Sequence, residues 1–193
     1  MILSKPFYTR PDVVQIARDL IGKYLFTQFE EGITGGIIIE TEAYEGATDR
    51  ASHAFGNRRT DRTEVMFAEG GVAYVYLCYG IHSLFNIVTN VKDIPHAVLI
   101  RGIHPVEGLD IMLTRAGKDK IVRGFGSGPG KVSKLLGIHY SHSGLDLQGD
   151  KIWVEDRGLE LAKQIISGVR IGVDYAGEDA LLPYRFRIPE EII

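Results

Sequence analysis

The stretch that decides the fold is Ile37-Ile38-Ile39-Glu40-Thr41-Glu42-Ala43-Tyr44. In a β-strand, successive side chains point to opposite faces of the sheet. One face of this strand has the composition of a core and carries Ile37, Ile39, Thr41 and Ala43. The other face carries Ile38, Glu40, Glu42 and Tyr44. The pattern therefore predicts a buried strand that ends with two carboxylates and an aromatic ring on one face.

Glu40 and Glu42 are candidates for acid–base chemistry. Neighbouring groups set the pKa and the orientation of a carboxylate at the end of a buried strand, and a general base needs both to be fixed. The alternative is that the two carboxylates form the solvated face of an edge strand. The spacing alone is compatible with both interpretations.

Further strand-like and helical segments lie on either side of this stretch. Strands are predicted over residues 24–29, 36–44, 73–79, 83–89, 97–103, 152–155 and 169–173. Helices are predicted over residues 11–21, with Thr9 as the N-cap, from about residue 106, after the 126–130 glycine loop, and over 159–166. The strands gather in the first half of the chain, which favours an α+β fold over a regular βαβ alternation. No repeat or linker divides the chain, so we expect a single domain over residues 1–193.

Composition excludes several classes of protein. The 193 residues are 45% hydrophobic and 24% charged, which allows a real core and excludes global disorder. The longest aliphatic runs, at 37–39 and 97–100, are far shorter than the roughly 20 residues of a membrane span. Residues 1–7 lack the apolar core of a signal peptide. We therefore expect a cytoplasmic location and no membrane partner.

The charges are unevenly distributed along the chain. There are 22 Lys+Arg and 25 Asp+Glu, a net charge of −3, and this mild acidity by itself argues against a strongly basic nucleic-acid binder. Residues 101–140, however, contain seven basic and three acidic residues. Local patches rather than net charge set the salt-dependent contact with DNA, so the acidity does not exclude a DNA-binding face around this segment.

Neither cysteine nor histidine usage indicates a metal site. Cys78 is the only cysteine, so the chain has no internal disulfide and no multi-cysteine zinc site. Its place in an apolar strand predicts a buried side chain rather than a nucleophile. The six histidines show no helical pairing with an intervening Glu. No metal is therefore predicted.

Residues 45–69 have no period of 2 or 3.6 residues and are rich in Asp, Arg, Thr, Asn and Gly. A loop of this length inside a compact domain is usually functional. The alternative is a mobile surface insertion.

Residues 74–86 predict a β-hairpin with a glycine in its turn. A two-residue loop after Tyr79 places Tyr76 opposite Phe85, whereas a three-residue loop places Tyr76 opposite Asn86 on one face. In the second register an aromatic ring and an amide face the same space. Tyr79 stands at the hairpin tip, where an aromatic side chain suits insertion between stacked bases. A tyrosine-rich strand packed in a core is the alternative.

A glycine-rich loop precedes one predicted helix and reads Gly124-Phe125-Gly126-Ser127-Gly128-Pro129-Gly130-Lys131. It fits neither the Walker A spacing nor G-x-G-x-x-G, which disfavours ATP and dinucleotide binding. Unpaired N–H groups at the start of a helix, together with Ser127 and Lys131, suit a single backbone phosphate. A structural turn is the alternative.

Several motifs follow one another in a fixed order over nearly the whole chain. They are Glu40-Thr41-Glu42-Ala43-Tyr44, Asp49-Arg50-Ala51-Ser52-His53-Ala54, Thr60-x-Arg62, Met66-Phe67, Tyr74-Val75-Tyr76-x-x-Tyr79-Gly80, Asn86, Arg101, Gly126-Ser127-Gly128-Pro129-Gly130-Lys131, Arg170-Ile171-Gly172-Val173 and Ala176-Gly177-Glu178. This order resembles the alkyladenine (3-methyladenine) DNA glycosylase family, the hairpin-inserting type without a helix-hairpin-helix. The chain departs from the family pattern after Arg62, where it has Thr63-Glu64-Val65 in place of the common Asn.

The resemblance implies an α+β domain with a mainly antiparallel, curved sheet, surrounding helices and a protruding β-hairpin that enters the minor groove of double-stranded DNA. It implies a monofunctional DNA glycosylase that flips alkylated or deaminated purines out of the duplex, hydrolyses the N-glycosidic bond without strand cleavage and so starts base-excision repair. No cofactor, no metal and no obligate protein partner are implied, and we expect a monomer. By position in the motifs, Glu42 matches the residue that activates water, and Arg101 matches the arginine that holds this carboxylate and the water.

The resemblance also implies roles around the damaged base. Tyr44 matches the aromatic residue on one side of the flipped base, with His53 and Tyr76 on the other side. Asn86 matches the residue that crowds the amino group of normal guanine, and Tyr79 matches the side chain that fills the gap in the duplex.

Two other functions are compatible with the same residues. One is hydrolysis of a small nucleoside or glycoside in a Glu42 pocket, which would not need Tyr79. The other is a non-catalytic domain that binds RNA or DNA.

Overall fold

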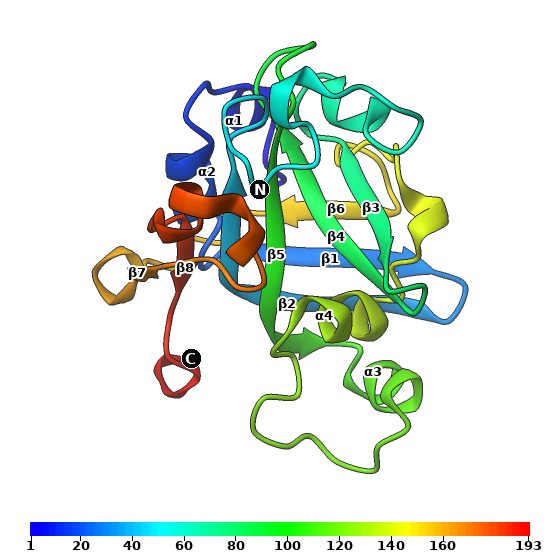
Figure 1. The fold of residues 1–193 in the computed structure, drawn as a ribbon. Coiled ribbons are helices and arrows are strands. Elements are labelled where there is room, and N and C mark those ends of the chain that lie inside the picture. The colour runs from blue at the N-terminus through cyan, green and yellow to red at the C-terminus, as the bar shows by residue number, and fades with distance from the viewer.

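The strands of the chain form one antiparallel sheet in the order β3-β4-β5-β2-β1-β6, and β8 pairs with both β2 and β7 (Figure 1). The strands are β1 (Tyr24–Phe29), β2 (Gly32–Tyr44), β3 (Ala73–Cys78), β4 (His82–Thr89), β5 (His96–Glu107), β6 (Ile152–Glu155), β7 (Ile166–Gly168) and β8 (Arg185–Arg187). The computed structural model describes residues 1–193 except for the side chain of Glu190.

Short helices surround this sheet. They are α1 (Lys5–Tyr8), α2 (Val13–Asp19), α3 (Leu109–Ala116) and α4 (Pro129–Leu136), with 3₁₀ turns η1 (Phe55–Asn57), η2 (Glu64–Phe67), η3 (Tyr140–His142), η4 (Ala162–Gln164), η5 (Asp174–Leu181) and η6 (Glu190–Ile192). α4 packs against β4 and β5, and α2 packs against β2. The predicted α+β class with an antiparallel sheet is therefore confirmed. Within the described part of the chain, no helix combines the length and the apolar character needed to cross a membrane.

β2 is an inner strand rather than an edge strand. β5 pairs with one side of it, while β1 and β8 share the other side. Ile37, Ile38 and Ile39 all belong to the main hydrophobic core, so both faces of the strand are buried at its centre. The edge-strand interpretation of Glu40 and Glu42 is therefore wrong.

A pair of β-bulges interrupts the regular alternation where β2 meets β5. Ile38 pairs with Ile103, Glu40 with Gly102, and Thr41 with Ile100. This register leaves Ile39 as the extra residue on β2 and Arg101 as the extra residue on β5. A bulge re-aims side chains locally, and here the consequence is that Arg101 reaches the two carboxylates of β2.

The glycine-rich loop lies directly on the bulged part of β5. The backbone of Ile103 donates to the Gly126 carbonyl oxygen (3.0 Å), and Gly128 donates to the Arg101 carbonyl oxygen (2.8 Å). A Cβ atom on Gly126 would lie 2.1 Å from the carbonyl oxygen of Ile103, so only glycine permits this approach. The loop thus has a structural role next to Arg101.

The hairpin of β3 and β4 adopts neither of the two predicted registers. Cys78 pairs with His82, and Tyr74 pairs with Asn86, so that Leu84 rather than Phe85 or Asn86 faces Tyr76. The reason is that Tyr79 and the following glycine both take left-handed backbone angles (φ 51° and 69°), which moves the turn one residue towards the N-terminus. Compared with the predicted three-residue loop, each residue of β3 pairs with a residue of β4 two positions earlier. A shift by an even number of residues keeps side chains on the same face, so Tyr76 and Asn86 still share a face, as predicted.

Three further predictions at the level of secondary structure are wrong. The N-cap of α2 is Asp12, whose side chain accepts from the Gln15 backbone N–H (2.8 Å), and not Thr9. Residues 159–166 do not form the predicted helix. Leu161 is buried but Ile166 is 44% exposed, so the apolar residues do not form the continuous buried face that would hold a helix on the core. Residues 169–173 are not a strand either, because the chain bends at Gly172 (φ 73°) and buries two side chains three residues apart, Arg170 and Val173, whereas a strand would bury every second one.

Candidate active site

Glu42 has a fully buried carboxylate with donors on both oxygens. The Tyr44 hydroxyl donates to Oε2 (2.8 Å), and the backbone N–H of Ile171 donates to Oε1 (2.8 Å). The Arg101 Nε atom lies 3.4 Å from Oε1. The side chain of Glu42 is 0% exposed, so these three groups replace the water that an exposed carboxylate would bind.

The pKa of Glu42 is raised above its ordinary value, and burial is the largest cause. The positive charge of Arg101 and the hydrogen bonds from Ile171 and Tyr44 act in the opposite direction, because they favour the ionised form. A carboxylate with a raised pKa is a stronger base than an exposed one, which is the property that a general base requires.

Glu40 has a different role from Glu42. Its Oε1 atom accepts from Arg101 Nε (3.1 Å) and from Arg185 Nε (2.6 Å). Arg185 belongs to β8, so the C-terminal part of the chain holds the carboxylate that in turn holds Arg101. The Glu40 side chain is nearly as buried as that of Arg101, at 12% and 11% exposed. The pair therefore fixes the guanidinium of Arg101 beside Glu42.

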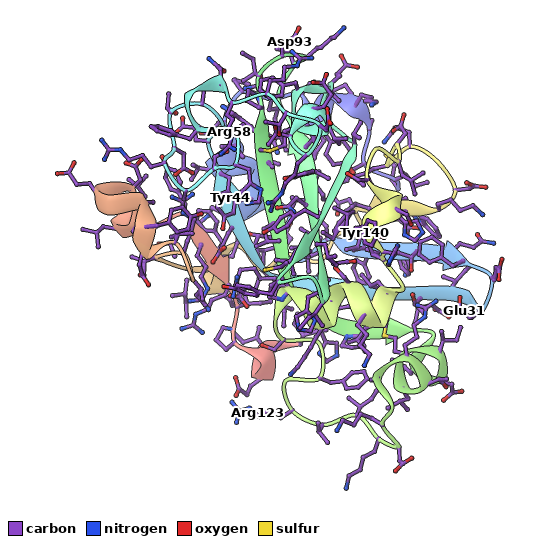
Figure 2. The ribbon with its side chains drawn as sticks, turned by 45° about the vertical axis from the view of Figure 1, so that its right-hand side comes forward. Glu31, Tyr44, Arg58, Asp93, Arg123 and Tyr140 are labelled. Carbon is purple, nitrogen blue, oxygen red and sulfur yellow. The ribbon has the colours of Figure 1, made fainter. Side chains whose placement is uncertain are left out.

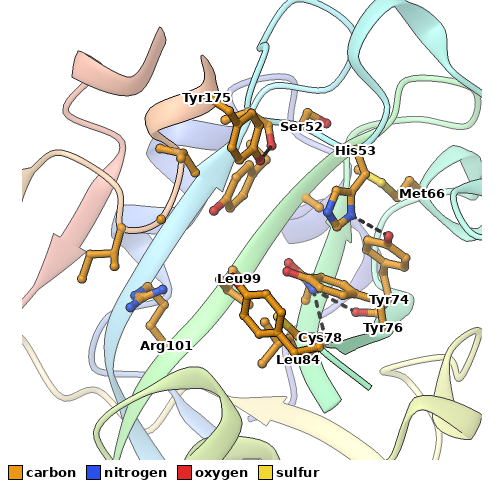
Figure 3. A pocket seen from close by; sticks show the side chains of 18 residues that line it. Ser52, His53, Met66, Tyr74, Tyr76, Cys78, Leu84, Leu99, Arg101 and Tyr175 are labelled. Atoms are coloured by element: carbon orange, nitrogen blue, oxygen red, sulfur yellow. Dashed lines mark hydrogen bonds between the residues drawn. The ribbon is translucent and has the colours of Figure 1, made fainter. Parts of the chain in front are cut away.

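A cavity of about 220 Å³ adjoins the residues that hold Glu42 (Figure 3). Tyr44, Arg101 and Ile171, the three residues that contact Glu42, all line it. The other lining residues are Ala51, Ser52, His53, Met66, Tyr74, Tyr76, Cys78, Tyr79, Leu84, Asn86, Ala97, Leu99, Gly172, Val173 and Tyr175. The wall combines aromatic rings with few charged groups, which is typical of a site for a planar organic ligand.

Three aromatic side chains form one wall of the cavity. The His53 ring lies edge-on to Tyr76 with centroids 4.7 Å apart, and its Nδ1 atom is 2.9 Å from the Tyr74 hydroxyl. Figure 3 shows this bond as a dashed line. Burial, followed by the charges of Arg62 and Arg58, lowers the pKa of His53 to about 4. The imidazole is therefore neutral at physiological pH, and its face can stack on a ligand that carries positive charge.

Comparison with known proteins identifies the family. Residues 6–192 match the model of the methylpurine-DNA glycosylase (MPG) family. The chain belongs to this family. Relatives provisionally named 3-methyladenine DNA glycosylases occur in Chlamydia abortus and Bacillus licheniformis, both 44% identical over 186 residues. These alignments cover 96% of this chain and 97% and 92% of the two relatives. A similar protein of Chlamydia felis is 43% identical and covers 95% of that relative.

Family membership makes the chain a DNA glycosylase, a hydrolase that acts on N-glycosyl bonds, and confirms both the predicted family and the predicted enzyme class. Most of the predicted site residues of this glycosylase lie together. Tyr44, His53, Tyr76, Tyr79, Asn86 and Arg101 line the cavity, and Glu42 contacts the lining residues Tyr44, Arg101 and Ile171.

Tyr79 occupies the rim of the cavity at the tip of the β3–β4 hairpin. Its side chain is 91% exposed, as the sequence predicted for a residue at the hairpin tip. The core interpretation of the tyrosine-rich strand therefore fails for Tyr79, whereas Tyr74 is buried at 2% exposure. Cys78, predicted to be buried, is half-buried and lines the cavity.

Ser127 and Lys131 do not line the cavity. Gly102 pairs with Ser127 by a bridge between backbones, and Lys131 Nζ donates to the Gly124 carbonyl oxygen (3.1 Å). The glycine loop lies beside the bulge that positions Arg101, so any phosphate bound there would be outside the cavity.

Residues 170–175 had no predicted role from the sequence, yet four of them line the cavity: Ile171, Gly172, Val173 and Tyr175. Arg170 forms a buried ion pair with Asp49 and also donates to the carbonyl oxygens of Ala43 (2.9 Å) and Asp179 (3.0 Å). Its guanidinium lies 4.8 Å from the centroid of the Tyr44 ring. Arg170 thereby fixes the segment whose next residue, Ile171, contacts Glu42. Arg170-Ile171-Gly172-Val173 is one of the motifs that carry the family resemblance. The contacts of Arg170 with Asp49 and of Ile171 with Glu42 depend on the fold and are seen only in the structure.

Proposed function

We propose that this glycosylase removes alkylated or deaminated purines from double-stranded DNA through a water molecule activated by Glu42. One observation carries the proposal: a fully buried carboxylate is held by Tyr44, Ile171 and Arg101, and all three of these residues line a cavity with several aromatic side chains. The relatives named as 3-methyladenine DNA glycosylases support the same class of damaged base.

Glu42 would act as the general base through Oε2. An ionised carboxylate has about four positions at which it can accept a hydrogen bond. Oε1 is engaged by Ile171 and approached by Arg101, whereas Oε2 accepts from the Tyr44 hydroxyl and retains a second lone pair, which would accept from a water molecule that enters with the nucleotide. That water would attack C1′ of the nucleotide as the base leaves, and Arg101 would hold both the carboxylate and the water. The product is an abasic site with both DNA strands intact.

The flipped base would lie between Tyr44 and the wall formed by His53 and Tyr76. An alkylated purine carries positive charge or has a weakened glycosidic bond, and a cationic ring stacks favourably on aromatic faces. A neutral His53 accommodates such a base, because a protonated imidazole would repel it. Stacking alone accepts any base, so selectivity has to come from the edge of the base and from its ability to leave.

Asn86 would provide this selectivity at the edge of the base. Its Nδ2 atom donates to the carbonyl oxygens of Tyr74 (3.2 Å) and Leu84 (3.3 Å), so both bonds use the amide nitrogen. These bonds fix the side chain in the cavity wall, where it would crowd the exocyclic amino group of normal guanine. A buried, hydrogen-bonded amide cannot easily move aside for that group.

Tyr79 would occupy the gap that the flipped nucleotide leaves in the duplex. Its exposure at a hairpin tip, beside Ile81 (74% exposed), suits an apolar wedge in the minor groove. Ser127 and Lys131 are proposed to contact a DNA phosphate at the start of α4. We further propose that residues 1–193 act as one domain, as a monomer and without an obligate protein partner, in the cytoplasm with the chromosome.

The test is incubation of the protein with alkylated duplex DNA. Release of free methylpurine, together with heat- or alkali-labile abasic sites, is the expected result. Glu42→Gln should bind duplex DNA that contains an abasic-site analogue but should not release base, whereas Glu69→Gln, on an exposed side chain, should behave like the unchanged protein. Full excision by Glu42→Gln would refute the assignment of the base.

A further inference from the structure

A cavity of about 220 Å³ is lined by residues of α3, α4 and the loop that connects them. In the view of Figure 1 this loop extends below both helices, at one end of the molecule. The apolar part of the lining consists of Ala116, Val122, Phe125 and Leu135. Phe125 and Leu135 belong to the main hydrophobic core. Val122 and its neighbour Ile121, by contrast, are 50% and 44% exposed, so apolar surface stays uncovered here.

Cationic side chains surround this apolar floor, and we call the site the basic cavity. They are Lys118, Arg123, Lys131 and Lys134. Among the described residues that line the cavity, none is acidic. The ion pairs of the described side chains include neither Lys118 nor Lys134, and both lysines are exposed. Lys131 Nζ donates to the neutral carbonyl oxygen of Gly124 (3.1 Å), so within the described part of the chain three of the four cations have no carboxylate as a partner.

Arg123 shows which kind of group this rim accepts. Its guanidinium forms an ion pair with Glu191 of η6. Glu191 follows a second glutamate and precedes Ile192 and Ile193, so the segment that supplies the carboxylate is acidic and apolar in sequence. The two paired side chains are 82% and 61% exposed, and an exposed ion pair contributes little to stability. A carboxylate of another protein can therefore replace Glu191 at small cost.

The apolar floor distinguishes between the polymers that could meet these cations. Neighbouring exposed apolar residues with polar groups around them mark a surface for a protein partner. DNA presents phosphates at its surface and keeps the apolar faces of its bases stacked, so it would pair with the lysines and leave Ile121 and Val122 uncovered. A protein segment supplies both kinds of group, because Asp and Glu can flank an aromatic or branched side chain. The basic cavity is as large as the cavity near Glu42, so one aromatic side chain can enter it.

The basic cavity is separate from the candidate active site. The two cavities share none of the described residues that line them. Figure 2 shows Arg123 at the opposite end of the molecule from Arg58, with Tyr44 between them. Of the rim residues, Lys131 is also proposed to contact a DNA phosphate, whereas Lys118 and Lys134 have no proposed contact with DNA. A partner in the basic cavity would therefore leave the cavity near Glu42 open.

We propose that the basic cavity binds an acidic segment of another protein through one aromatic or branched anchor side chain. The anchor enters the cavity over Val122 and Phe125, and Asp or Glu residues on either side of it pair with Lys118 and Lys134. Opposite charge also speeds the encounter and disfavours basic partners. The contact recruits the glycosylase without blocking its site, and it is not obligate, because the fold and the chemistry proposed for Glu42 do not depend on it.

The first experiment uses a fluorescein-labelled peptide with one phenylalanine between two runs of aspartate, and measures its binding to the full chain by fluorescence anisotropy. Replacement of the phenylalanine by serine should weaken binding about ten-fold or more, because the burial of a large apolar side chain is lost. Lys118→Gln and Lys134→Gln should each weaken it about three-fold, the size expected of an exposed charge pair. Lys163→Gln is the matched control and should change nothing, since Lys163 is an exposed lysine outside the cavity.

Two results of this experiment would overturn the proposal. Equal affinities of the phenylalanine and serine peptides would mean that charge alone holds the peptide. Equal effects of Lys134→Gln and Lys163→Gln would mean that the peptide binds elsewhere on the protein.

The second experiment adds an unlabelled duplex with an abasic-site analogue to the complex of protein and labelled peptide. The anisotropy should rise further, because the peptide stays bound while the complex becomes larger. Displacement of the peptide, with a matching loss of duplex affinity in Lys134→Gln, would assign the cations to the DNA interface and overturn the proposal. The analogue contains no N-glycosidic bond, so neither result depends on excision. Failure of the proposed function would appear separately, as no release of base by the unchanged protein.

Discussion

The backbone N–H of Ile171 donates to Oε1 of Glu42 at 2.8 Å, although 129 residues separate the two along the chain. The contact makes the segment after β7 part of the proposed catalytic site. It supplies a donor that stabilises the ionised carboxylate and needs no particular side chain at position 171. What the segment does need is the anchor at Arg170, whose ion pair with Asp49 joins it to the loop after β2.

The pH dependence of excision should report the pKa of Glu42. A general base is active when deprotonated, so activity should fall as the pH falls through the raised pKa of this carboxyl. The charge of Arg101 lowers that pKa, and its removal in Arg101→Gln should therefore move the acidic limb of the rate profile to higher pH. Single-turnover rates between pH 4 and pH 9 would measure the shift; the rate at the plateau should fall as well.

Arg185→Gln is the control for this prediction. Arg185 contacts Glu40 and not Glu42, so the acidic limb of its profile should move less than that of Arg101→Gln. An acidic limb that stays in place or moves to lower pH in Arg101→Gln would contradict the assignment of Glu42 as the titrating base.

The buried pair of Asp49 and Arg170 should matter strongly for stability. The two side chains are 1% and 0% exposed, and Asp49 also accepts from the backbone N–H of Ala51 (2.9 Å). Asp49→Asn leaves the guanidinium buried without a counter-charge, and this should reduce the free energy of unfolding by about 3–5 kcal/mol. Urea denaturation followed by circular dichroism would measure it. Asp93→Asn removes an exposed carboxylate that pairs with Arg59, and its unfolding midpoint should stay nearly unchanged.

Much of the fold followed from patterns in the sequence, and the errors have physical reasons. The bounds of β1 and β6 agree with the prediction because both are short runs rich in aromatic and β-branched residues, with turns or bends on either side. The register of the β3–β4 hairpin could not be predicted from the sequence, because it depends on a left-handed backbone angle at Tyr79. Such an angle is unusual for a residue other than glycine, asparagine or aspartate.

The site likewise contains residues that the sequence predicts and contacts that it does not predict. Glu42 and Tyr44 were found because the strand period places them on one face, and their hydrogen bond confirms that they meet. The bulge that brings Arg101 to them depends on pairing between β2 and β5 and on the glycine loop behind it, which no local pattern contains. The wall around Ile171 depends on one long-range ion pair.

Gly126→Ala should disrupt the support of Arg101. The added Cβ would lie 2.1 Å from the carbonyl oxygen of Ile103, a backbone atom that cannot move without shifting β5. Overpacking of this kind costs about 1–3 kcal/mol, and thermal unfolding should show a lower Tm. Gly168→Ala is the matched control, because a Cβ there meets no atom within 4 Å. If Gly126→Ala were as stable and as active as Gly168→Ala, the loop would not support β5 as described.

Substitution of Tyr79 should separate the stability of the fold from the action of the hairpin tip on duplex DNA. Tyr79 is 91% exposed and has φ 51°, so its side chain contributes little to packing and its backbone is strained. Tyr79→Gly removes a left-handed penalty of about 1–2 kcal/mol and adds about 0.5–1 kcal/mol of lost backbone entropy, so the Tm should stay equal or rise. Excision from duplex DNA should nevertheless fall, because nothing then fills the gap left by the flipped nucleotide, whereas excision from single-stranded DNA should change little. Tyr79→Phe, which keeps the ring, should retain most of the duplex activity. Undiminished duplex activity in Tyr79→Gly would instead favour a hydrolase of small nucleosides, and turnover of free nucleosides would be the measurement to make next.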